Sequence, residues 1–206
     1  MTIRLKLYLF VKRLTDILGG CAGLIVFLPV FILVPILIKL NDPEGPVFFS
    51  QIRVGQGGKV FRMYKFRSMV VHAEDMLDQL LEQNEVTGAM FKMRDDPRVT
   101  AVGRFLRRTS LDELPQFINV LKGDMSLVGP RPPLPREVAD YSAYHFQRLL
   151  VRPGCTGLWQ VRGRSHVGFE AMVKMDLMYI EKRGFRLDSQ IIIQTIGELF
   201  HSNSAC

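Results

Sequence analysis

Two adjacent carboxylates, Asp112 and Glu113, lie in the stretch Ser110-Leu-Asp-Glu-Leu-Pro-Gln116. Apolar residues follow them at helical spacing, at Leu114, Phe117, Ile118 and Leu121. Pro115 fits only in the first turn of such a helix, because proline lacks a backbone N–H. We therefore expect the pair near a helix N-terminus, where peptide dipoles favour an ionised carboxylate and any phosphate close by.

This pair has two interpretations, and the stretch alone leaves both open. Ser110-x-x-Glu113 is by itself a capping box, which closes a helix start without any chemistry. Basic residues surround the pair, although capping does not require them: Arg104, Arg107, Arg108, Lys122 and Arg131. In such surroundings a carboxylate could act on a phosphorylated substrate as nucleophile, metal ligand or base, with the guanidinium groups as bidentate phosphate clamps.

Two further basic residues are candidates for phosphate binding. Lys65 shares one face of a predicted strand with Arg67 and could point at a substrate, although a solvated strand face explains it equally well. Arg131 lies between prolines in Gly129-Pro-Arg-Pro-Pro133, and their fixed φ angles reduce the entropy lost when a loop grips a ligand. The alternative for Arg131 is a surface proline turn.

The segment Gly157-Leu-Trp-Gln-Val-Arg-Gly-Arg164 combines glycine turns with the sole tryptophan, the polar Gln160 and the basic Arg164. Glycines allow close backbone approach, an indole offers a stacking surface, and arginines bind phosphate oxygens. We expect this segment to contact a nucleotide diphosphate through Gln160 and Arg164.

Composition limits the class of protein. A chain of 206 residues can form one domain with a real core. The net charge of +7 indicates an anionic partner, which could be nucleic acid, an acidic membrane surface or a phosphorylated small molecule. The three cysteines lie far apart and match neither a disulfide framework nor a zinc site, which indicates a reduced, cytosol-facing protein.

Residues 17–38 carry no charge, and about 22 residues at about 1.5 Å each suffice to cross a hydrocarbon core of about 30 Å. Basic residues lie on both sides of this run, so the positive-inside rule places both flanks in the cytoplasm. Pro29, near the middle, and Pro35 remove backbone hydrogen bonds, which favours a broken helix that enters the membrane and returns to the same face. A kinked spanning helix is the alternative.

The remaining patterns predict an α+β, mainly helical fold. Residues 47–54 and 59–69 are β-leaning runs joined by glycines, which predicts a small β-hairpin. Residues 72–84 read as an acidic helix, and residues 95–97 as a loop. Two helices follow in the last third, one ending near Arg183, and the second is either an interfacial amphipathic helix or a core helix. We expect a membrane-embedded re-entrant helix over residues 1–40 and a catalytic domain over residues 41–206.

Several motifs in one order resemble those of bacterial sugar transferases, the polyprenyl-phosphate phosphoglycosyl transferase family, in its small monotopic form. They are Lys12-Arg13-x-x-Asp16, Tyr64-Lys-Phe-Arg-Ser-Met69, Ser110-Leu-Asp-Glu-Leu-Pro-Gln116, Asn119-Val-Leu-Lys-Gly-Asp-Met-Ser126, Gly129-Pro-Arg-Pro132, Arg152-Pro-Gly154 and Gly157-Leu-Trp-Gln-Val161. The resemblance covers nearly the whole chain. Two departures are Leu28, where a small hydroxylated residue is frequent before the proline, and Arg162, where Ser or Asn is common.

The resemblance implies transfer of a sugar 1-phosphate from a UDP-sugar to undecaprenyl phosphate at the bacterial inner membrane, with the catalytic domain facing the cytoplasm. It implies that Asp112 is the nucleophile, working with Mg²⁺ as a metal ligand, with Glu113 beside it. It also implies that Arg107, Arg131 and Arg164 contact phosphate. The identity of the sugar, the glycan pathway and the oligomeric state, monomer or homodimer, stay open.

Two rival functions need different tests. In the first, Asp112 is a base or metal ligand for direct transfer, without a covalent intermediate. In the second, the chain is a membrane-tethered basic module that binds anionic lipid or nucleic acid without catalysis. Nucleic acid is not the expected partner, because the aromatic residues are not interleaved with the basic ones as a stacking platform requires.

Overall fold

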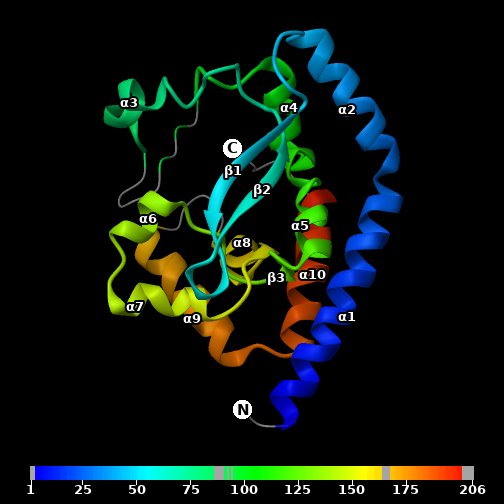
Figure 1. The fold of residues 1–206 in the computed structure, drawn as a ribbon, viewed down its shortest axis with the longest axis vertical. Helices are drawn as coiled ribbons and strands as arrows, with labels where there is room; N and C mark the ends of the chain where they lie inside the picture. Colours follow the sequence, from blue (N-terminus) through cyan, green and yellow to red (C-terminus); the bar gives the residue numbers. More distant parts are fainter. Residues whose placement is uncertain (1–2, 86–90, 92, 94, 164–167, 201–206) are drawn as a thin grey trace.

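The computed structural model describes residues 3–85, 91, 93, 95–163 and 168–200. The fold is mainly helical with two small sheets (Figure 1), which confirms the α+β, mainly helical class. The α-helices are α1 Ile3–Val26, α2 Leu28–Asn41, α3 Leu77–Leu80, α4 Ala101–Arg108, α5 Gln116–Lys122, α6 Pro135–Ala139, α7 Ala143–Phe146, α8 Leu158–Arg162, α9 Phe169–Lys182 and α10 Phe185–Phe200. The strands are β1 Phe48–Val54, β2 Val60–Phe66, β3 Ser126–Val128 and β4 Gly154–Thr156, and the 3₁₀ turns are η1 Gln56–Gly58, η2 Leu81–Gln83, η3 Leu111–Glu113 and η4 Gln147–Leu150.

Helices α1 and α2 form a bent pair along one side of the molecule (Figure 1), with an angle of 57° between them. The break lies at Phe27, and Pro29 occupies the second position of α2. This is the expected effect of Pro29, because its ring excludes the carbonyl four residues before it and interrupts the preceding turn. The prediction of a second break at Pro35 is wrong, since Pro35 lies inside α2.

The bent pair has one face toward the protein and one away from it. Val34 and Ile38 of α2 are buried against Phe66 of β2 and Leu106 of α4. Large apolar side chains on the other faces are exposed, among them Leu7, Phe10, Leu14, Leu18, Ile25, Leu28, Ile32, Leu33, Ile36 and Leu40. In the described part of the chain, no helix alone has the length and apolar composition of a membrane span, and only α1 and α2 taken together reach it.

The predicted hairpin is present, with β1 and β2 antiparallel from the pair Phe48–Phe66 to the pair Val54–Val60. Gly57 and Gly58 adopt positive φ angles in the turn, which glycine accepts without steric cost. The predicted helix over residues 72–84 is wrong for most of its length, because only Leu77–Leu80 is α-helical and Leu81–Gln83 is a 3₁₀ turn. Before α3 the backbone turns instead: His72 has a φ of 62°, outside the right-handed helical region, and the Asp75 and Leu77 N–H groups donate to the carbonyls of His72 and Glu74, three residues before them.

A second, parallel sheet joins β3 to β4, with Ser126 opposite Gly154 and Val128 opposite Thr156. The sequence patterns did not predict it, because strands of three residues are too short for an alternation to be read. Asp16 of α1 fixes its position, since one carboxylate oxygen accepts from both the Ser126 hydroxyl and the Leu127 backbone N–H at 2.9 Å.

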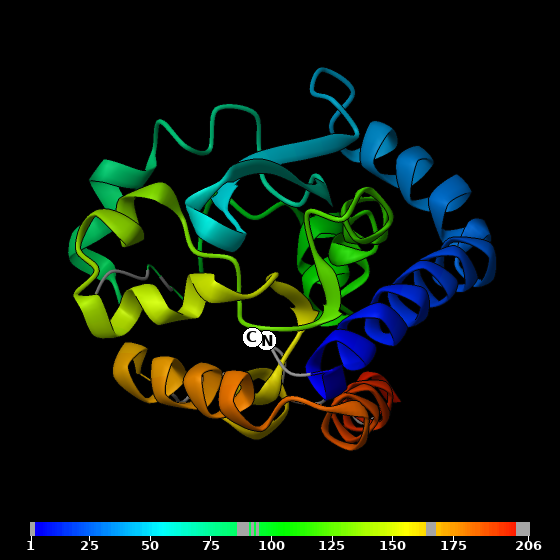
Figure 2. The ribbon, with the colours of Figure 1, turned by 60° about the horizontal axis from the view of Figure 1, so that its bottom comes forward.

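The two helices predicted for the last third are confirmed as α9 and α10. They lie on the side of the molecule away from the hairpin, and α10 runs beside α1 (Figure 2). The Tyr8 hydroxyl and the Lys12 ammonium, both on α1, donate to the Asp188 carboxylate at the start of α10. Ile191 of α10 is buried in the core while Ile193 and Ile196 are exposed, so this helix contributes to the core on one side only.

Candidate active site

The predicted carboxylate pair lies on the 3₁₀ turn η3, immediately before α5. Asp112 is 6% exposed, whereas the Glu113 side chain is 45% exposed. Ser110 has a left-handed backbone (φ 55°) and its side chain makes no capping hydrogen bond. The capping-box interpretation is therefore wrong. The Ser110 side chain does not accept the backbone hydrogen bond that a capping box requires, and the Glu113 carboxylate binds the Lys65 ammonium instead.

Lys65, on β2, is the partner of the pair. Its ammonium donates to Glu113 Oε1 at 2.6 Å and lies 4.0 Å from Asp112 Oδ2. Lys65 was a candidate for substrate binding or for a solvated strand face, and the structure places its charge beside the two carboxylates, while its contact with phosphate stays a prediction. The contact joins residues 48 positions apart, so the hairpin and the turn before α5 build the site together.

The two carboxyl groups have opposite electrostatic surroundings. Burial raises the pKa of Asp112, and the neighbouring Glu113 carboxylate adds to this, while Lys65 and Arg107 oppose it. Burial also acts on Glu113, but the Lys65 ammonium outweighs it and the pKa of Glu113 is lowered. Divergent pKa values in adjacent carboxyl groups are typical of catalytic pairs with separate roles.

Arg107 lies in the last turn of α4, on the exposed surface. Its Nε donates to the Ser68 hydroxyl at 2.9 Å, and its charge acts on Asp112. Arg107 therefore lies close enough to the carboxylate pair for its charge to act on Asp112. Its contact with phosphate stays a prediction.

Arg131 is fixed in the rigid loop that its two prolines predict. Its guanidinium binds both oxygens of Glu137, which is 1% exposed, with N–O distances of 2.9–3.3 Å. Arg148 Nη2 donates to the Arg131 carbonyl at 3.2 Å and also binds Asp176, with both side chains of this ion pair 1% exposed. Arg131 thus carries a bidentate pair already, and a phosphate would have to bind its remaining N–H groups or displace Glu137.

A further buried cation, Arg53 of β1, lies near this loop and donates to the Pro132 carbonyl at 2.9 Å. Burial and the nearby charge of Arg131 together lower the pKa of Arg53 to about 10. Arg53 and Arg131 both act on Glu113 and help to lower its pKa. This concentration of positive charge beside the carboxylates favours an anionic ligand.

Gln160 lies on α8, and its Oε1 is buried without a hydrogen-bond partner among the described residues. The Nε1 of the neighbouring Trp159 is likewise buried without a hydrogen-bond partner among the described residues. No contact between Gln160 and the carboxylate pair is found in the described part of the chain, so the role of Gln160 stays a prediction. Arg164 lies outside the described residues.

The residues present fit a Mg²⁺ ion shared with a substrate. Mg²⁺ usually takes one or two carboxylates and completes its shell with water and phosphate oxygens, and Asp112 and Glu113 supply two adjacent carboxylates. Over the described residues, no three His, Cys, Asp or Glu side chains gather to hold a metal. Asp112 and Glu113 are thus the residues that would hold Mg²⁺, which stays a prediction.

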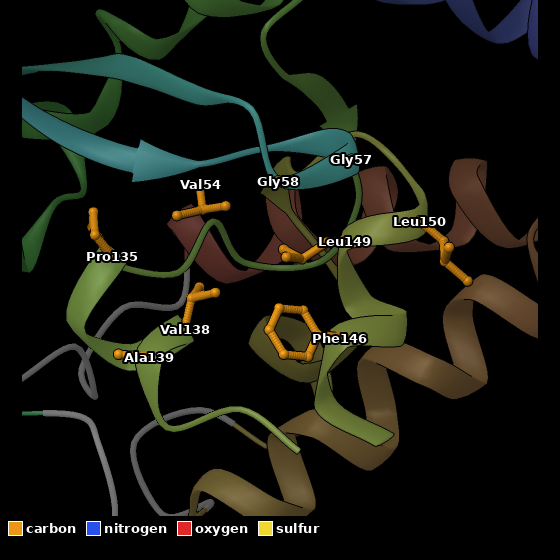
Figure 3. Close-up of a pocket in the computed structure, with 9 residues that line it drawn as sticks. All are labelled: Val54, Gly57, Gly58, Pro135, Val138, Ala139, Phe146, Leu149 and Leu150. Atoms are coloured by element: carbon orange, nitrogen blue, oxygen red, sulfur yellow. The ribbon is translucent and has the colours of Figure 1, made fainter. Parts of the chain in front are cut away.

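A separate pocket lies between the hairpin turn, α6 and the α7–η4 segment (Figure 3). Its lining is apolar or glycine: Val54, Gly57, Gly58, Pro135, Val138, Ala139, Phe146, Leu149 and Leu150. None of these side chains can neutralise a phosphate, so the pocket is not the anion site.

Sequence reasoning missed Arg53, Glu137, Arg148 and Asn119. The first three are ordinary charged residues whose roles depend on pairing across the fold. Asn119 could have been singled out from the sequence, because asparagine is unfavourable inside a helix.

The comparisons with known proteins identify the family of the chain. The family model described as bacterial sugar transferase matches residues 7–202. The chain belongs to this family. A galactosyl transferase, CpsE, of Streptococcus agalactiae is 47% identical over 202 residues, which is 95% of this chain and 44% of that protein. An undecaprenyl-phosphate galactose phosphotransferase of Salmonella typhimurium is 43% identical over 200 residues, 95% of this chain and 42% of the relative.

An exopolysaccharide production protein, ExoY, of Rhizobium meliloti is 39% identical over 189 residues, 90% of this chain and 83% of that protein. The chain thus spans less than half the length of the first two relatives and most of the length of the third. The resemblance drawn from the motifs is confirmed at the level of the family.

Proposed function

We propose that this chain transfers a sugar 1-phosphate from a UDP-sugar to a polyprenyl phosphate such as undecaprenyl phosphate, as a membrane step of surface polysaccharide synthesis. The observation that carries the proposal is the buried Asp112 beside the Lys65–Glu113 ion pair. A buried carboxylate that caps nothing and faces several cations is suited to react with a phosphate.

In the proposed mechanism, an Asp112 oxygen attacks the phosphorus that carries the sugar. A P–O bond forms to Asp112, the P–O bond to the UMP oxygen breaks, and UMP leaves with that electron pair. The polyprenyl phosphate then attacks the same phosphorus, forms the diphosphate and returns Asp112 to the carboxylate. Bound Mg²⁺, held by Asp112 and the substrate phosphates, would supply charge neutralisation during transfer.

The cations near the pair have distinct proposed roles. Lys65 keeps Glu113 ionised and lowers the cost of ionising Asp112. Arg107 and Arg131 bind the phosphates of the donor, because planar guanidinium groups match phosphate oxygens. Gln160 and Arg164 are proposed to contact the nucleotide.

The acceptor in this reaction is a lipid, and the position of the bent helix pair supports that choice. The α2 residues Val34 and Ile38 pack directly on Phe66, the last residue of β2, one position after Lys65. The opposite side of α2 exposes large apolar side chains. We propose that α1 and α2 form a re-entrant anchor in the bacterial inner membrane, with the catalytic residues at its cytoplasmic surface.

The names of further relatives favour a UDP-sugar without fixing which one. One from Aeromonas hydrophila is named a UDP-N-acetylgalactosamine-undecaprenyl-phosphate N-acetylgalactosaminephosphotransferase, and one from Escherichia coli a UDP-glucose:undecaprenyl-phosphate glucose-1-phosphate transferase. They are 41% and 40% identical to this chain.

The test is to incubate purified protein and Mg²⁺ with undecaprenyl phosphate and each of several UDP-sugars, and to measure UMP and the lipid diphosphate. We expect both products in equal amounts with at least one sugar, and none with the Asp112→Asn variant. A basic tethering module would bind anionic vesicles and release no UMP with any donor, which would contradict the proposal.

A further inference from the structure

Asn119 occupies the middle of α5 and is fully buried, although its side chain is a polar amide. Its Oδ1 accepts from the Tyr64 backbone N–H at 3.0 Å, and its Nδ2 donates to the Arg62 carbonyl at 2.7 Å. The same Nδ2 also donates to the Asp124 carboxylate at 3.2 Å. The amide therefore pairs with the edge of β2 much as a neighbouring strand would.

These contacts connect the two elements that build the candidate active site. Tyr64 precedes Lys65 on β2, and Asn119 belongs to the helix that begins just after Asp112 and Glu113. An amide that donates and accepts on the same strand edge fixes the register of that strand, because a slip of one residue reverses the side-chain direction and breaks both bonds.

The chain segment beyond Lys65 is fixed by a different helix. The Ser68 carbonyl accepts from the Thr100 backbone N–H at 3.1 Å, and the Ser68 hydroxyl accepts from Arg107. A Cβ on Gly103 would lie 1.9 Å from the Ser68 carbonyl oxygen, so α4 packs directly against this backbone. Lys65 therefore lies between two segments of backbone that are held by hydrogen bonds. Asn119 of α5, the helix that follows the carboxylates, holds the segment before Lys65.

We propose that Asn119 is a positioning residue, whose side-chain amide sets where the Lys65 ammonium lies relative to Asp112 and Glu113. The inference rests on the proposed function, because positioning affects turnover only if the carboxylate pair performs the transfer. The Lys65 ammonium lies 2.6 Å from Glu113 and 4.0 Å from Asp112, and the position of β2 decides where its side chain starts. Displacement of β2 against α5 would separate the ammonium from both carboxylates.

The test compares Asn119→Leu with Lys65→Met, and uses Asn41→Leu as the matched control. Leucine is close to asparagine in size and introduces no charge, so it removes the amide contacts without a direct electrostatic effect. Asn41 lies exposed at the end of α2 and accepts one backbone hydrogen bond from Val102 at 3.3 Å. Asn119→Ala serves as the second variant, in case Asn119→Leu does not fold.

The decisive readout is the titration of the Asp112 carboxyl group, followed by NMR in protein with ¹³C-labelled aspartate. We expect Asn119→Leu to raise the pKa of Asp112 in the same direction as Lys65→Met. The Lys65→Met/Asn119→Leu double variant should show no further increase, because Asn119 acts through Lys65. Asn41→Leu should titrate as wild type. Turnover of the two folded Asn119 variants should fall by roughly 10- to 100-fold.

An Asp112 titration that stays at the wild-type position in both Asn119 variants would overturn the inference and assign Asn119 a purely structural role. So would a double variant whose increase is the sum of the single increases. The NMR titration needs no substrate. Wild-type protein without transfer activity would therefore refute the proposed function, while the titration still decides whether Asn119 positions Lys65.

Discussion

The Lys65 ammonium donates to Glu113 Oε1 at 2.6 Å, so the Glu113 carboxylate is bound by the hairpin and does not cap a helix. The Ser110 side chain makes no capping bond, so the Glu113 carboxylate is available to hold Lys65. The same ammonium lies 4.0 Å from the buried Asp112. One cation from the hairpin thus sets the charge balance of both carboxylates.

Glu113→Gln should abolish most turnover while it changes stability little. The substitution keeps the size of the side chain and removes the charge that Lys65 balances, and the pair is partly exposed, so the free energy of unfolding should change by less than about 1 kcal/mol. Kinetics and thermal unfolding in detergent measure the two effects. Ser110→Ala is the control for capping: a capping serine would lose about 0.5–2 kcal/mol, whereas we expect almost no loss.

The pH dependence of turnover should report Asp112. A nucleophilic Asp112 must be ionised, and its pKa is raised by burial and by Glu113, so activity should fall with decreasing pH at a higher pH than for an ordinary aspartate. Lys65 opposes that increase. Lys65→Met should therefore move the acidic limb of kcat/KM to still higher pH. A limb that stays in place or moves to lower pH would show that Lys65 does not act on the ionisation of Asp112.

Local patterns predicted the elements of this fold better than the contacts between them. The hairpin, the break near Pro29 and the last two helices follow from spacing and from proline and glycine chemistry. Residues 72–84 were wrongly predicted as one helix, because His72 has a φ of 62°, outside the right-handed helical region, and no local pattern reveals this turn. In the candidate site, too, the residues were easier to predict than the contacts between them.

Asp112, Glu113, Lys65, Arg107 and Arg131 were identifiable from residue type and neighbours. Their partners were not, because each contact joins distant positions or depends on a loop shape. Lys65 was a candidate for substrate binding, and its proximity to Glu113 depends on how β2 packs against α5. The pairing of Arg131 with the buried Glu137 likewise depends on the proline-rich loop between them.

Arg131→Lys should be more damaging than its retained charge suggests. A planar guanidinium can hold both oxygens of Glu137 and still offer N–H groups to a phosphate, whereas an ammonium presents a single point of charge. The loss of one charge-assisted hydrogen bond costs about 1.5–3 kcal/mol, which corresponds to a drop in kcat/KM of about 10- to 150-fold. Near-normal kinetics in the lysine variant would show that Arg131 only supports the loop.

Both ends of the bent helix pair should lie on the cytoplasmic side of the membrane. Basic residues lie in the first half of α1, at Arg4, Lys6, Lys12 and Arg13, and others follow α2 from Arg53 on, and the pair is bent by 57°. Single cysteines at the exposed positions Arg4 and Glu44, in a variant without the native cysteines, should both be protected from an impermeant thiol reagent in spheroplasts and should both react with it in inverted vesicles. Opposite accessibility at the two positions would establish a spanning helix instead.

The central claim is the covalent role of Asp112, and one measurement with donor alone tests it most directly. Protein, Mg²⁺ and the UDP-sugar that supports turnover are mixed without lipid acceptor, and UMP and the mass of the protein are followed in time. We predict a burst of one UMP per active site and an added mass of one sugar phosphate on Asp112. Asp112→Asn, which keeps the size of the side chain, should show neither. Release of UMP only after the polyprenyl phosphate is added, with no adduct trapped on the wild-type protein, would contradict the account.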